Sequence, residues 1–467
     1  MIQRTSEAFV LFLVTLLVSC SGRGASGGQG ANADSTGTQG HELPDTLRVA
    51  TLYSPTSYFI YRDEAMGYDY SLVSELAREK GIVLKIEVAP SLASAVEMIE
   101  KGQADVLASR VPVTADYVDK LHHCGPEIST TQVLVQRLSP PDSLVRDVTS
   151  LPHRTIWVEG RSKYEQRLRH LDQELGGGIN ICTVDPDSLT AEDLVEMVSD
   201  KKIPLTIVDS DVARLNKTYF PDLDISLELS FKQNARWAVA KEKAWLGDSI
   251  DAWLGGEYPR RENDILLRKY FELAKNTPTV ANFNFKGGKI SQYDNLFRHS
   301  ADAIGWDWRL LAAVCFVESG FRNDVTSWAG AKGIMQIMPS TGRLYGVDAA
   351  GLLDPATSIE TAAKIFKVLE DSYKPQIKNQ RERLKFILAA YNSGPGHISD
   401  AIALARKYGH DPAVWEGNVA ECLMLKSNAG YYNDPVVRNG YFRARETLDY
   451  VDRVLDFYDR AVRAIHR

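Results

Sequence analysis

The sequence predicts a multidomain protein in which an α/β region precedes a mainly α-helical region. Strand-like and helix-like segments alternate across residues 46–275, a pattern typical of an α/β sheet. Further along, a helix ends at Glu318, and a Gly-rich segment follows it. Residues 21–45 are small and polar without an apolar period, so they cannot bury a core and are expected to form a flexible tether.

The α/β region opens with two strands and two helices whose patterns are readable. Residues 46–50 and 83–88 are expected to form strands. Residues 71–81 are expected to form a helix because their apolar residues share one face. A second helix is expected from Ser94, followed by a turn at Gly102 and a third strand. Ligands of such sheets bind at the carboxyl ends of the strands.

Glu318 shares one helix face with Leu311, Val314 and Cys315, which precede it by seven, four and three positions. A carboxylate on a buried face loses its hydration, so burial favours the protonated form. A general acid must carry its proton near neutral pH. A structural role at the helix end explains Glu318 alone equally well. The Gly-rich, Met-Gln segment that follows favours the catalytic interpretation.

Four motifs follow one another in this second region. They are Glu318-Ser319 with Phe321; Ser327, Gly330-Ala331, Gly333 and Met335-Gln336; Ala390-Tyr391-Asn392-Ser393-Gly394-Pro395-Gly396; and Glu446-Thr447 before Tyr450-Val451. With these motifs, residues 289–467 resemble the catalytic core of the soluble lytic transglycosylase family, whose fold is related to goose-type lysozyme. Val325 and Ile334 replace the family's usual Ala and Leu, both apolar exchanges.

The resemblance implies a reaction on the glycan strands of peptidoglycan, between N-acetylmuramic acid and N-acetylglucosamine. Glu318 is the implied general acid and then base, and the product is a 1,6-anhydro sugar. The residues implied to contact substrate are Ser319, Met335, Gln336, Tyr391 and Asn392. Gly330 and Gly333 are expected to let the backbone approach the glycan. No metal or cofactor is expected.

The α/β region is similar to extracellular solute-binding proteins that bind amino acids. The similarity rests on residues 47–50, 67–72 and 102–106. It implies two lobes, with the second beginning near Leu151 and the chain returning to the first at 237–239. Amino-acid binders carry a Thr-x-x-x-Arg element where this chain has 113–117 without that Arg, so binding through an α-carboxylate is not supported.

The order of the two regions resembles the membrane-bound lytic murein transglycosylase F family. That resemblance implies a periplasmic enzyme with a lysozyme-like catalytic domain at residues 289–467. Because this enzyme is fused directly behind the binding-like domain, residues 46–275 are expected to regulate it. A muropeptide or an amino-acid-like compound is the expected ligand of the front domain. We expect ligand-driven hinge motion there to reshape the groove near Glu318.

Residues 1–20 are expected to form a lipoprotein signal peptide. Residues 8–18 are an apolar run too short to span a bilayer, and residues 17–20 read Leu-Val-Ser-Cys. This resembles a bacterial lipobox, in which Cys20 becomes lipidated. No Asp follows Cys20, which favours anchoring at the periplasmic face of the outer membrane. An ordinary cleavable signal is the alternative.

The charge and the cysteine content of the chain argue against a nucleic-acid-binding protein and against a metal site. The chain has a formal net charge of −7, which argues against nucleic-acid binding. Residues 289–467 hold 23 Lys and Arg against 21 Asp and Glu, so the negative excess lies in the front part. The cysteines form no CxxC pair, which argues against a metal site. A Cys315–Cys422 disulfide and free thiols are both open, with free thiols favoured.

Two rival functions remain at the level of sequence. A lysozyme-type hydrolase would use the same acid at Glu318 and let water attack. A tethered solute-binding or sensor protein would use its lysozyme-like part only to grip glycan, but the intact Glu318 and Gln336 argue against this. The sequence also leaves open the oligomeric state and whether cleavage is at chain ends or within chains.

Overall fold

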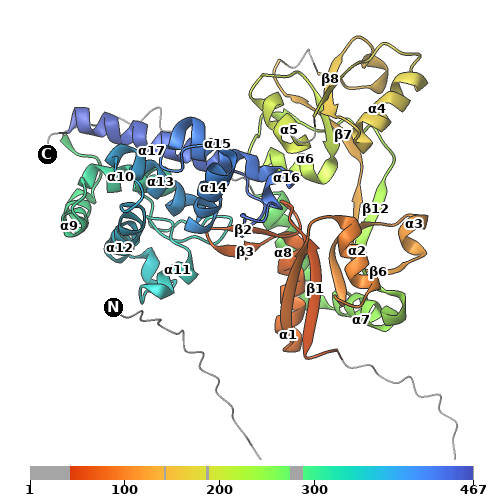
Figure 1. Cartoon of the computed structure of the whole chain (residues 1–467), viewed down its shortest axis with the longest axis horizontal. Coiled ribbons are helices and arrows are strands. Elements are labelled where there is room, and N and C mark those ends of the chain that lie inside the picture. The colour runs from red at the N-terminus through yellow and green to blue at the C-terminus, as the bar shows by residue number, and fades with distance from the viewer. Residues whose placement is uncertain (1–42, 141–143, 186–188, 274–284, 286–287, 466–467) are drawn as a thin grey trace, which may run out of the picture. The chain divides into compact units, whose positions relative to one another are not determined.

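The computed structural model describes residues 43–140, 144–185, 189–273, 285 and 288–465 (Figure 1). The predicted signal peptide, and residues 21–42 of the predicted tether, lie outside the described residues. The described chain contains two five-stranded sheets and a helical region, which confirms the predicted order of an α/β part before a mainly α part.

The first lobe is built on a sheet with the strand order β4-β1-β5-β12-β6. Its strands are β1 (Thr46–Leu52), β4 (Val83–Ala89), β5 (Val106–Pro112), β6 (Leu121–Thr130) and β12 (Gln233–Ala240). Its helices are α1 (Tyr68–Lys80), α2 (Leu92–Glu100), α3 (Ala115–Val118), α7 (Ala244–Leu254) and α8 (Glu257–Phe271). Strands β4, β1 and β5 run parallel, and β12 is antiparallel to both neighbours. The predicted first two strands are therefore confirmed, and α1 begins three residues before the predicted helix.

The second lobe has the strand order β11-β7-β10-β8-β9. Its elements are β7 (Gln132–Arg137), β8 (Thr155–Glu159), α4 (Lys163–Glu174), β9 (Asn180–Val184), α5 (Ala191–Ser199), β10 (Thr206–Asp209), α6 (Ser210–Lys217) and β11 (Leu223–Asp224). The prediction that this lobe begins near Leu151 is wrong, because β7 already belongs to its sheet. Only Thr131 separates β6 from β7, so one nearly continuous extended run enters both sheets without a turn signal.

Two chain segments link the lobes and pair with each other. Gln233 is the register partner of Thr130, and the Leu229 N–H donates to the Gln132 carbonyl at 2.7 Å. The return at residues 237–239 is confirmed, since β12 lies in the first sheet. Two paired crossings of this kind are the geometry of a hinge between lobes.

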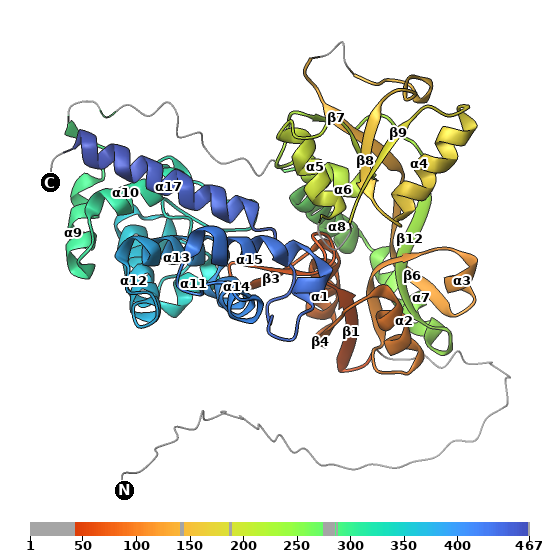
Figure 2. The same ribbon diagram turned by 45° about the horizontal axis from the view of Figure 1, so that its top comes forward.

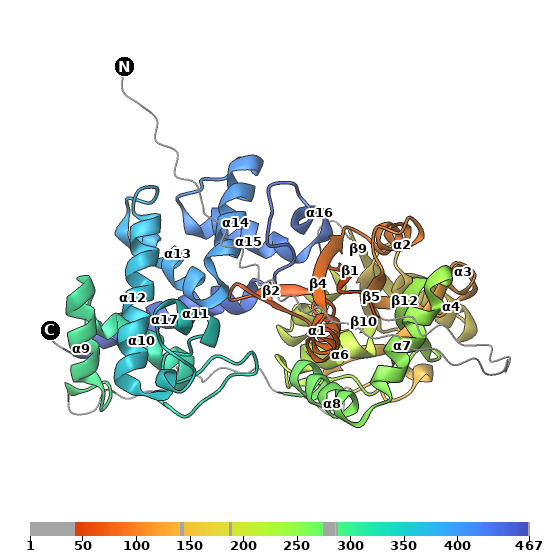
Figure 3. The same cartoon turned by 90° about the horizontal axis from the view of Figure 1, so that it is seen from below.

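A short hairpin, β2 (Phe59–Tyr61) and β3 (Glu64–Met66), stands apart from both large sheets. In Figures 1 and 3 it extends from the first lobe toward the helices of the catalytic region. Its two turn residues, Arg62 and Asp63, both have positive φ, 51° and 60°. A two-residue turn of this hand normally uses Asn or Gly, so the contacts around the turn must hold it in place.

The helical region, which the sequence predicts to be catalytic, is a bundle of helices around its own core. Its helices are α9 (Asp294–Ile304), α10 (Trp308–Ser319), α11 (Pro339–Leu344), α12 (Pro355–Tyr373), α13 (Gln380–Ser393), α14 (Pro395–Tyr408), α15 (Ala420–Met424), α16 (Ala429–Tyr432) and α17 (Arg445–Ala464). Helix α17 lies along α10 and α13 (Figure 2). Asp307 and Asp354 cap α10 and α12 by accepting from the Arg309 and Thr357 N–H groups.

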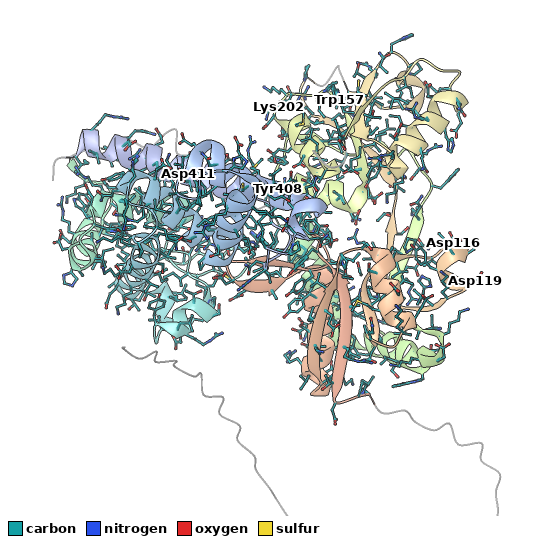
Figure 4. All side chains as sticks on the ribbon, viewed as in Figure 1. Asp116, Asp119, Trp157, Lys202, Tyr408 and Asp411 are labelled. Atoms are coloured by element: carbon teal, nitrogen blue, oxygen red, sulfur yellow. The ribbon has the colours of Figure 1, made fainter. Side chains whose placement is uncertain are left out.

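Two further features of the described residues are the state of the cysteines and the character of the helices. Cys124, Cys182, Cys315 and Cys422 are free, which agrees with the favoured prediction. Within the described ranges, none of the helices has the length and apolar character to cross a membrane. Figure 4 shows the side chains on these elements, with Trp157 on β8 and Asp116 on α3 among those labelled.

Asp105 joins β1 to the start of α7 and gives the first lobe a pH-dependent clamp. Arg48 Nη2 and Lys243 Nζ donate to its carboxylate at 2.7 and 2.6 Å. Burial alone would raise the pKa of Asp105, but the hydrogen bonds from Arg48 and Lys243 outweigh it and bring the pKa to about 2. A folded-state pKa below the unfolded value stabilises the fold above pH ~4, and that stability is lost as the pH falls toward 2.

We expect Asp105→Asn to lower the free energy of unfolding at pH 7 by about 1–2 kcal/mol, allowing for screening by nearby solvent. The deficit relative to the wild type should shrink as the pH falls from 5 to 2.5. Urea unfolding across this pH range measures both effects. Asp116→Asn, at an exposed position on α3, is the control and should show neither. A deficit that stays constant with pH would contradict this account.

Candidate active site

Helix α10 delivers Glu318 to the surface of the catalytic core. Leu311, Val314 and Cys315 are fully buried, as their shared face with Glu318 predicts. The helix ends at Gly320, whose φ of 63° turns the chain away and whose N–H donates to the Phe316 carbonyl. The Glu318 side chain is 6% exposed, so its carboxylate sits at the edge of the core.

Arg62, at the tip of the β2–β3 hairpin, forms an ion pair with the Glu318 carboxylate. Its Nη2 lies 3.1 Å from Oε2 and 3.3 Å from Oε1. Its Nη1 donates to the Gln336 carbonyl at 2.5 Å and its Nε to the Asn392 carbonyl at 3.0 Å. The Arg62 backbone N–H also donates to the Ser393 carbonyl at 3.0 Å. A residue of the first lobe therefore occupies the centre of the predicted site.

The surroundings of Arg62 keep its guanidinium charged. Burial would lower the pKa of Arg62, but the charge of Glu318 and the interactions with Tyr61, Tyr450 and Tyr391 together outweigh burial and hold the pKa well above the ordinary value. Arg62 Nη2 contacts both carboxylate oxygens of Glu318, so the guanidinium occupies the position from which the acid would face a substrate.

Tyr450 and Tyr391 bound the site on the side of the core. Burial, and then the charge of Glu318, raise the pKa of Tyr450 well above its ordinary value. The Tyr391 hydroxyl donates to the Met335 carbonyl at 2.8 Å, and its ring stacks on Phe366 at 4.4 Å. Tyr450 was not among the predicted site residues, although the motif containing it was recognised.

The other predicted contact residues fall into two groups. Ser319 and Met335 are buried, and the Ser319 hydroxyl donates to the Ile334 carbonyl at 2.7 Å, so both face the core behind Glu318. Gln336 and Asn392 border Arg62 through their backbone carbonyls. Their side chains are held internally, Gln336 Nε2 by the Gly333 carbonyl at 2.8 Å and Asn392 Oδ1 by the Thr447 hydroxyl at 2.7 Å.

Gly333 corrects one expectation from the sequence. It has a φ of 73°, and a Cβ there would lie 1.8 Å from the Leu352 carbonyl oxygen. The close approach that requires glycine is therefore to the chain's own backbone, not to the glycan. At Gly330, with a φ of 102°, a Cβ would meet open space.

A groove of about 360 Å³ lies beside Arg62, between the hairpin and the helical region. Gln336, Met338, Tyr345 and Tyr391 line it from the catalytic side, and the hairpin residues Arg62, Asp63 and Glu64 line it from the first lobe. Glu64 accepts a hydrogen bond from the Ser340 hydroxyl. The hairpin therefore forms one wall of this groove while Arg62 contacts Glu318.

Comparison with known proteins places both regions. Residues 295–413 match the Transglycosylase SLT domain family. The membrane-bound lytic murein transglycosylase F of Desulfosudis oleivorans is 30% identical over 417 residues, covering 88% of each chain. That of Aeromonas salmonicida is 32% identical over 422 residues, covering 88% of this chain and 81% of its own. The second substrate-binding domain of Lactococcus lactis GlnP, in its open conformation, covers 50% of this chain and 98% of its own, with 18% identity and a TM-score of 0.43.

The matched helical domain and the curated relatives define an enzyme of the lytic transglycosylase class. The likeness to the two curated proteins extends through the α/β region as well as the helical one. The chain belongs to the membrane-bound lytic murein transglycosylase F family.

We expect Gly333→Ala to lower the free energy of unfolding of the catalytic region by about 3 kcal/mol or more, since its Cβ would overlap a backbone oxygen. Gly320→Ala is the matched control, because φ is similar but a Cβ there meets nothing within 4 Å. Its cost should be only the left-handed strain of about 1–2 kcal/mol. Thermal or urea unfolding followed by near-UV circular dichroism measures both. Equal losses in the two variants would contradict the steric explanation.

Proposed function

We propose that this protein cleaves peptidoglycan glycan strands between N-acetylmuramic acid and N-acetylglucosamine without water, giving 1,6-anhydro-muramyl products. The observation that carries this proposal is Glu318, a nearly buried carboxylate whose ion-pair partner Arg62 lines a groove on the helical region. Gln336, Tyr391 and Asn392 border the same point and are proposed to position the sugar, with Ser319 and Met335 supporting them from the core. Lytic transglycosylase activity on murein in the relatives supports this assignment.

The chemistry needs a single acid that works twice. Protonated Glu318 donates to the leaving glycosidic oxygen, and the C1–O bond breaks with positive charge developing at the anomeric carbon. The resulting carboxylate then takes the proton of the muramic C6 hydroxyl, whose oxygen attacks the same carbon. The substrate's own N-acetyl group is proposed to stabilise the intermediate in place of a second carboxylate. The proton returns to Glu318, so no water is consumed.

A hydrolase is the second candidate for the same acid. It differs only in the nucleophile, water instead of the C6 hydroxyl. Mass spectrometry of the products from purified peptidoglycan separates the two, because the reducing-end product of hydrolysis is heavier than the anhydro product by one water. Anhydro-muramyl products support the transglycosylase, and reducing-end products without them would establish the hydrolase.

The catalytic role of Glu318 is best tested without the Arg62 ion pair. In an Arg62→Ala background, we expect Glu318→Gln to reduce turnover of peptidoglycan by about 10²–10⁴-fold, the usual contribution of a general acid. Gln keeps the shape but cannot donate or retake the proton. Circular dichroism and glycan pull-down should remain those of the Arg62→Ala parent. Near-parental turnover would rule out this role for Glu318.

The front domain, residues 46–275, is proposed to regulate the catalytic domain, residues 289–467, by placing Arg62 on Glu318. Its ligand is proposed to bind between the lobes, where Arg110 of β5 forms an ion pair with Asp211 of α6. Asp69 lies on the same side of the first lobe, fully buried, and accepts from Ser57 and Trp237. A muropeptide or an amino-acid-like compound carries both charges needed to compete for Arg110 and Asp211.

The location is proposed from the amino terminus. Residues 1–20 are proposed to be a lipoprotein signal peptide, with Cys20 lipidated and residues 21–45 serving as a tether. The relatives are membrane-bound by name, which supports attachment. The periplasmic face of the outer membrane is the proposed site, and Cys20→Ala should release the protein from the membrane fraction or leave it unprocessed.

Removing the hairpin's charge should activate the enzyme. We expect Arg62→Ala to raise turnover of peptidoglycan by at least about tenfold in the absence of added muropeptide, the worth of one hydrogen bond to a charged group. Release of soluble muropeptides measures the rate. Arg78→Ala, which removes an exposed guanidinium from the same lobe, is the matched control and should leave the rate unchanged. No activation by Arg62→Ala would refute the regulatory role of this contact.

A further inference from the structure

The second lobe also holds the catalytic region, at a segment far from Glu318 in the chain. The Tyr441 hydroxyl donates to Glu192 of α5 at 2.7 Å. Arg443 donates to Asn216 of α6 at 2.9 Å and lies over the Tyr219 ring at 4.5 Å. We call residues 441–443 the lobe-2 contact segment.

The first lobe is held at a second point, next to the Arg62 turn. His397, at the start of α14, bonds through Nε2 to the Ile60 carbonyl of β2 at 2.8 Å. Ile60 lies two residues before Arg62 on the same strand and turn. The position of the hairpin therefore depends on His397 as well as on the contacts of Arg62 itself.

The direction of the His397 bond follows from its other partner. Lys426 Nζ lies 2.8 Å from His397 Nδ1 and 2.6 Å from Asp400 Oδ2, and the Lys426 side chain is fully buried. An ammonium group only donates, so Nδ1 must accept and Nε2 carries the hydrogen given to Ile60. Burial, and then the charge of Lys426, hold the pKa of His397 well below its usual value, so the ring stays neutral.

The stacked rings of Phe442 and His397 connect the contact with the second lobe to the contact with the first. The Phe442 ring stacks on the His397 imidazole, with centroids 4.1 Å apart and planes at 25°. The Phe442 N–H donates to the Lys426 carbonyl at 3.0 Å. Phe442 lies between Tyr441 and Arg443, two of the residues that bind the second lobe. A displacement of the lobe-2 contact segment must therefore move the ring that supports His397.

We propose that Phe442 and His397 form a relay through which the second lobe controls the seating of the β2–β3 hairpin on Glu318. The inference rests on the proposed regulatory function and names its route. The hairpin belongs to the first lobe, whereas Glu192 and Asn216 belong to the second. A hinge rotation between the lobes therefore cannot preserve the contacts of both lobes with the catalytic region. Withdrawal of the second lobe pulls Phe442 from His397, weakens the bond to Ile60 and frees Arg62 from Glu318.

The test uses the full periplasmic chain and measures hydrogen–deuterium exchange of the hairpin amides, residues 59–66. The variant Tyr441→Phe removes only the hydroxyl that binds Glu192, and Phe442→Leu removes the stacked ring while keeping apolar volume. We expect Tyr441→Phe to speed exchange of the hairpin by about tenfold, the worth of one hydrogen bond to a charged group. Phe442→Leu should speed it by about two- to tenfold, the worth of one stacked aromatic pair. Tyr408→Phe is the matched control, since its hydroxyl also binds a carboxylate, Asp434 at 2.9 Å, but contacts neither lobe.

Peptidoglycan turnover provides the second arm. Tyr441→Phe and Phe442→Leu should raise turnover in the wild-type background and add nothing in the Arg62→Ala background. Unchanged hairpin exchange in both variants, with the control also unchanged, would overturn the relay. Faster hairpin exchange without any change in turnover would keep the relay and instead count against regulation through Arg62. Equal increases of turnover in both backgrounds would show a direct effect on the catalytic region and would also overturn the relay.

Discussion

A buried ion pair between Arg62 and Glu318 is the constraint on which the rest of the structure depends. Removing two charges from water is costly, and Coulomb attraction offsets this only when the remaining donors and acceptors are satisfied. Here the carbonyls of Gln336 and Asn392 satisfy the guanidinium. Both carbonyls belong to the motif segments of the catalytic region. The backbone segments that surround Glu318 therefore also bind Arg62, the residue paired with Glu318.

The hairpin turn is strained in the conformation that the ion pair requires. Arg62 and Asp63 both have positive φ without being glycine, a conformation that costs about 1 kcal/mol or more for each residue. The strain persists because Arg62 is bound at both its side chain and its backbone N–H. Once those contacts are lost, relaxation of the turn lowers its free energy. A hairpin that has begun to leave Glu318 is therefore favoured to leave completely. This is the behaviour of a two-state element.

Features set by local spacing could be predicted from the sequence, whereas features set by contacts between distant segments could not. The buried face of α10 and the motif around Glu318 were predictable because residues three and four apart share a helix face, whatever the distant chain does. Arg62 was not predictable, because it reaches Glu318 across 256 positions and its turn lacks an Asn-Gly signal. The start of the second lobe was misplaced because one extended run enters two sheets. The need for glycine at Gly333 arises from Leu352, which only the folded chain brings near.

The uneven charge of the chain bears on how firmly the second lobe is held to the helical region. The front part holds the excess of acidic residues, and some of them face the catalytic region, where Arg445 pairs with Glu196 at 2.8 Å and Asp200 at 3.0 Å. Burial raises the pKa of Glu196, and the charge of Arg445 only opposes this, so the cost of desolvation offsets much of the attraction. Ion pairs of this kind fix the relative position of the two elements while adding little to the free energy of unfolding. A ligand needs only a differential affinity of a few kcal/mol for the two lobe arrangements to change which one is populated.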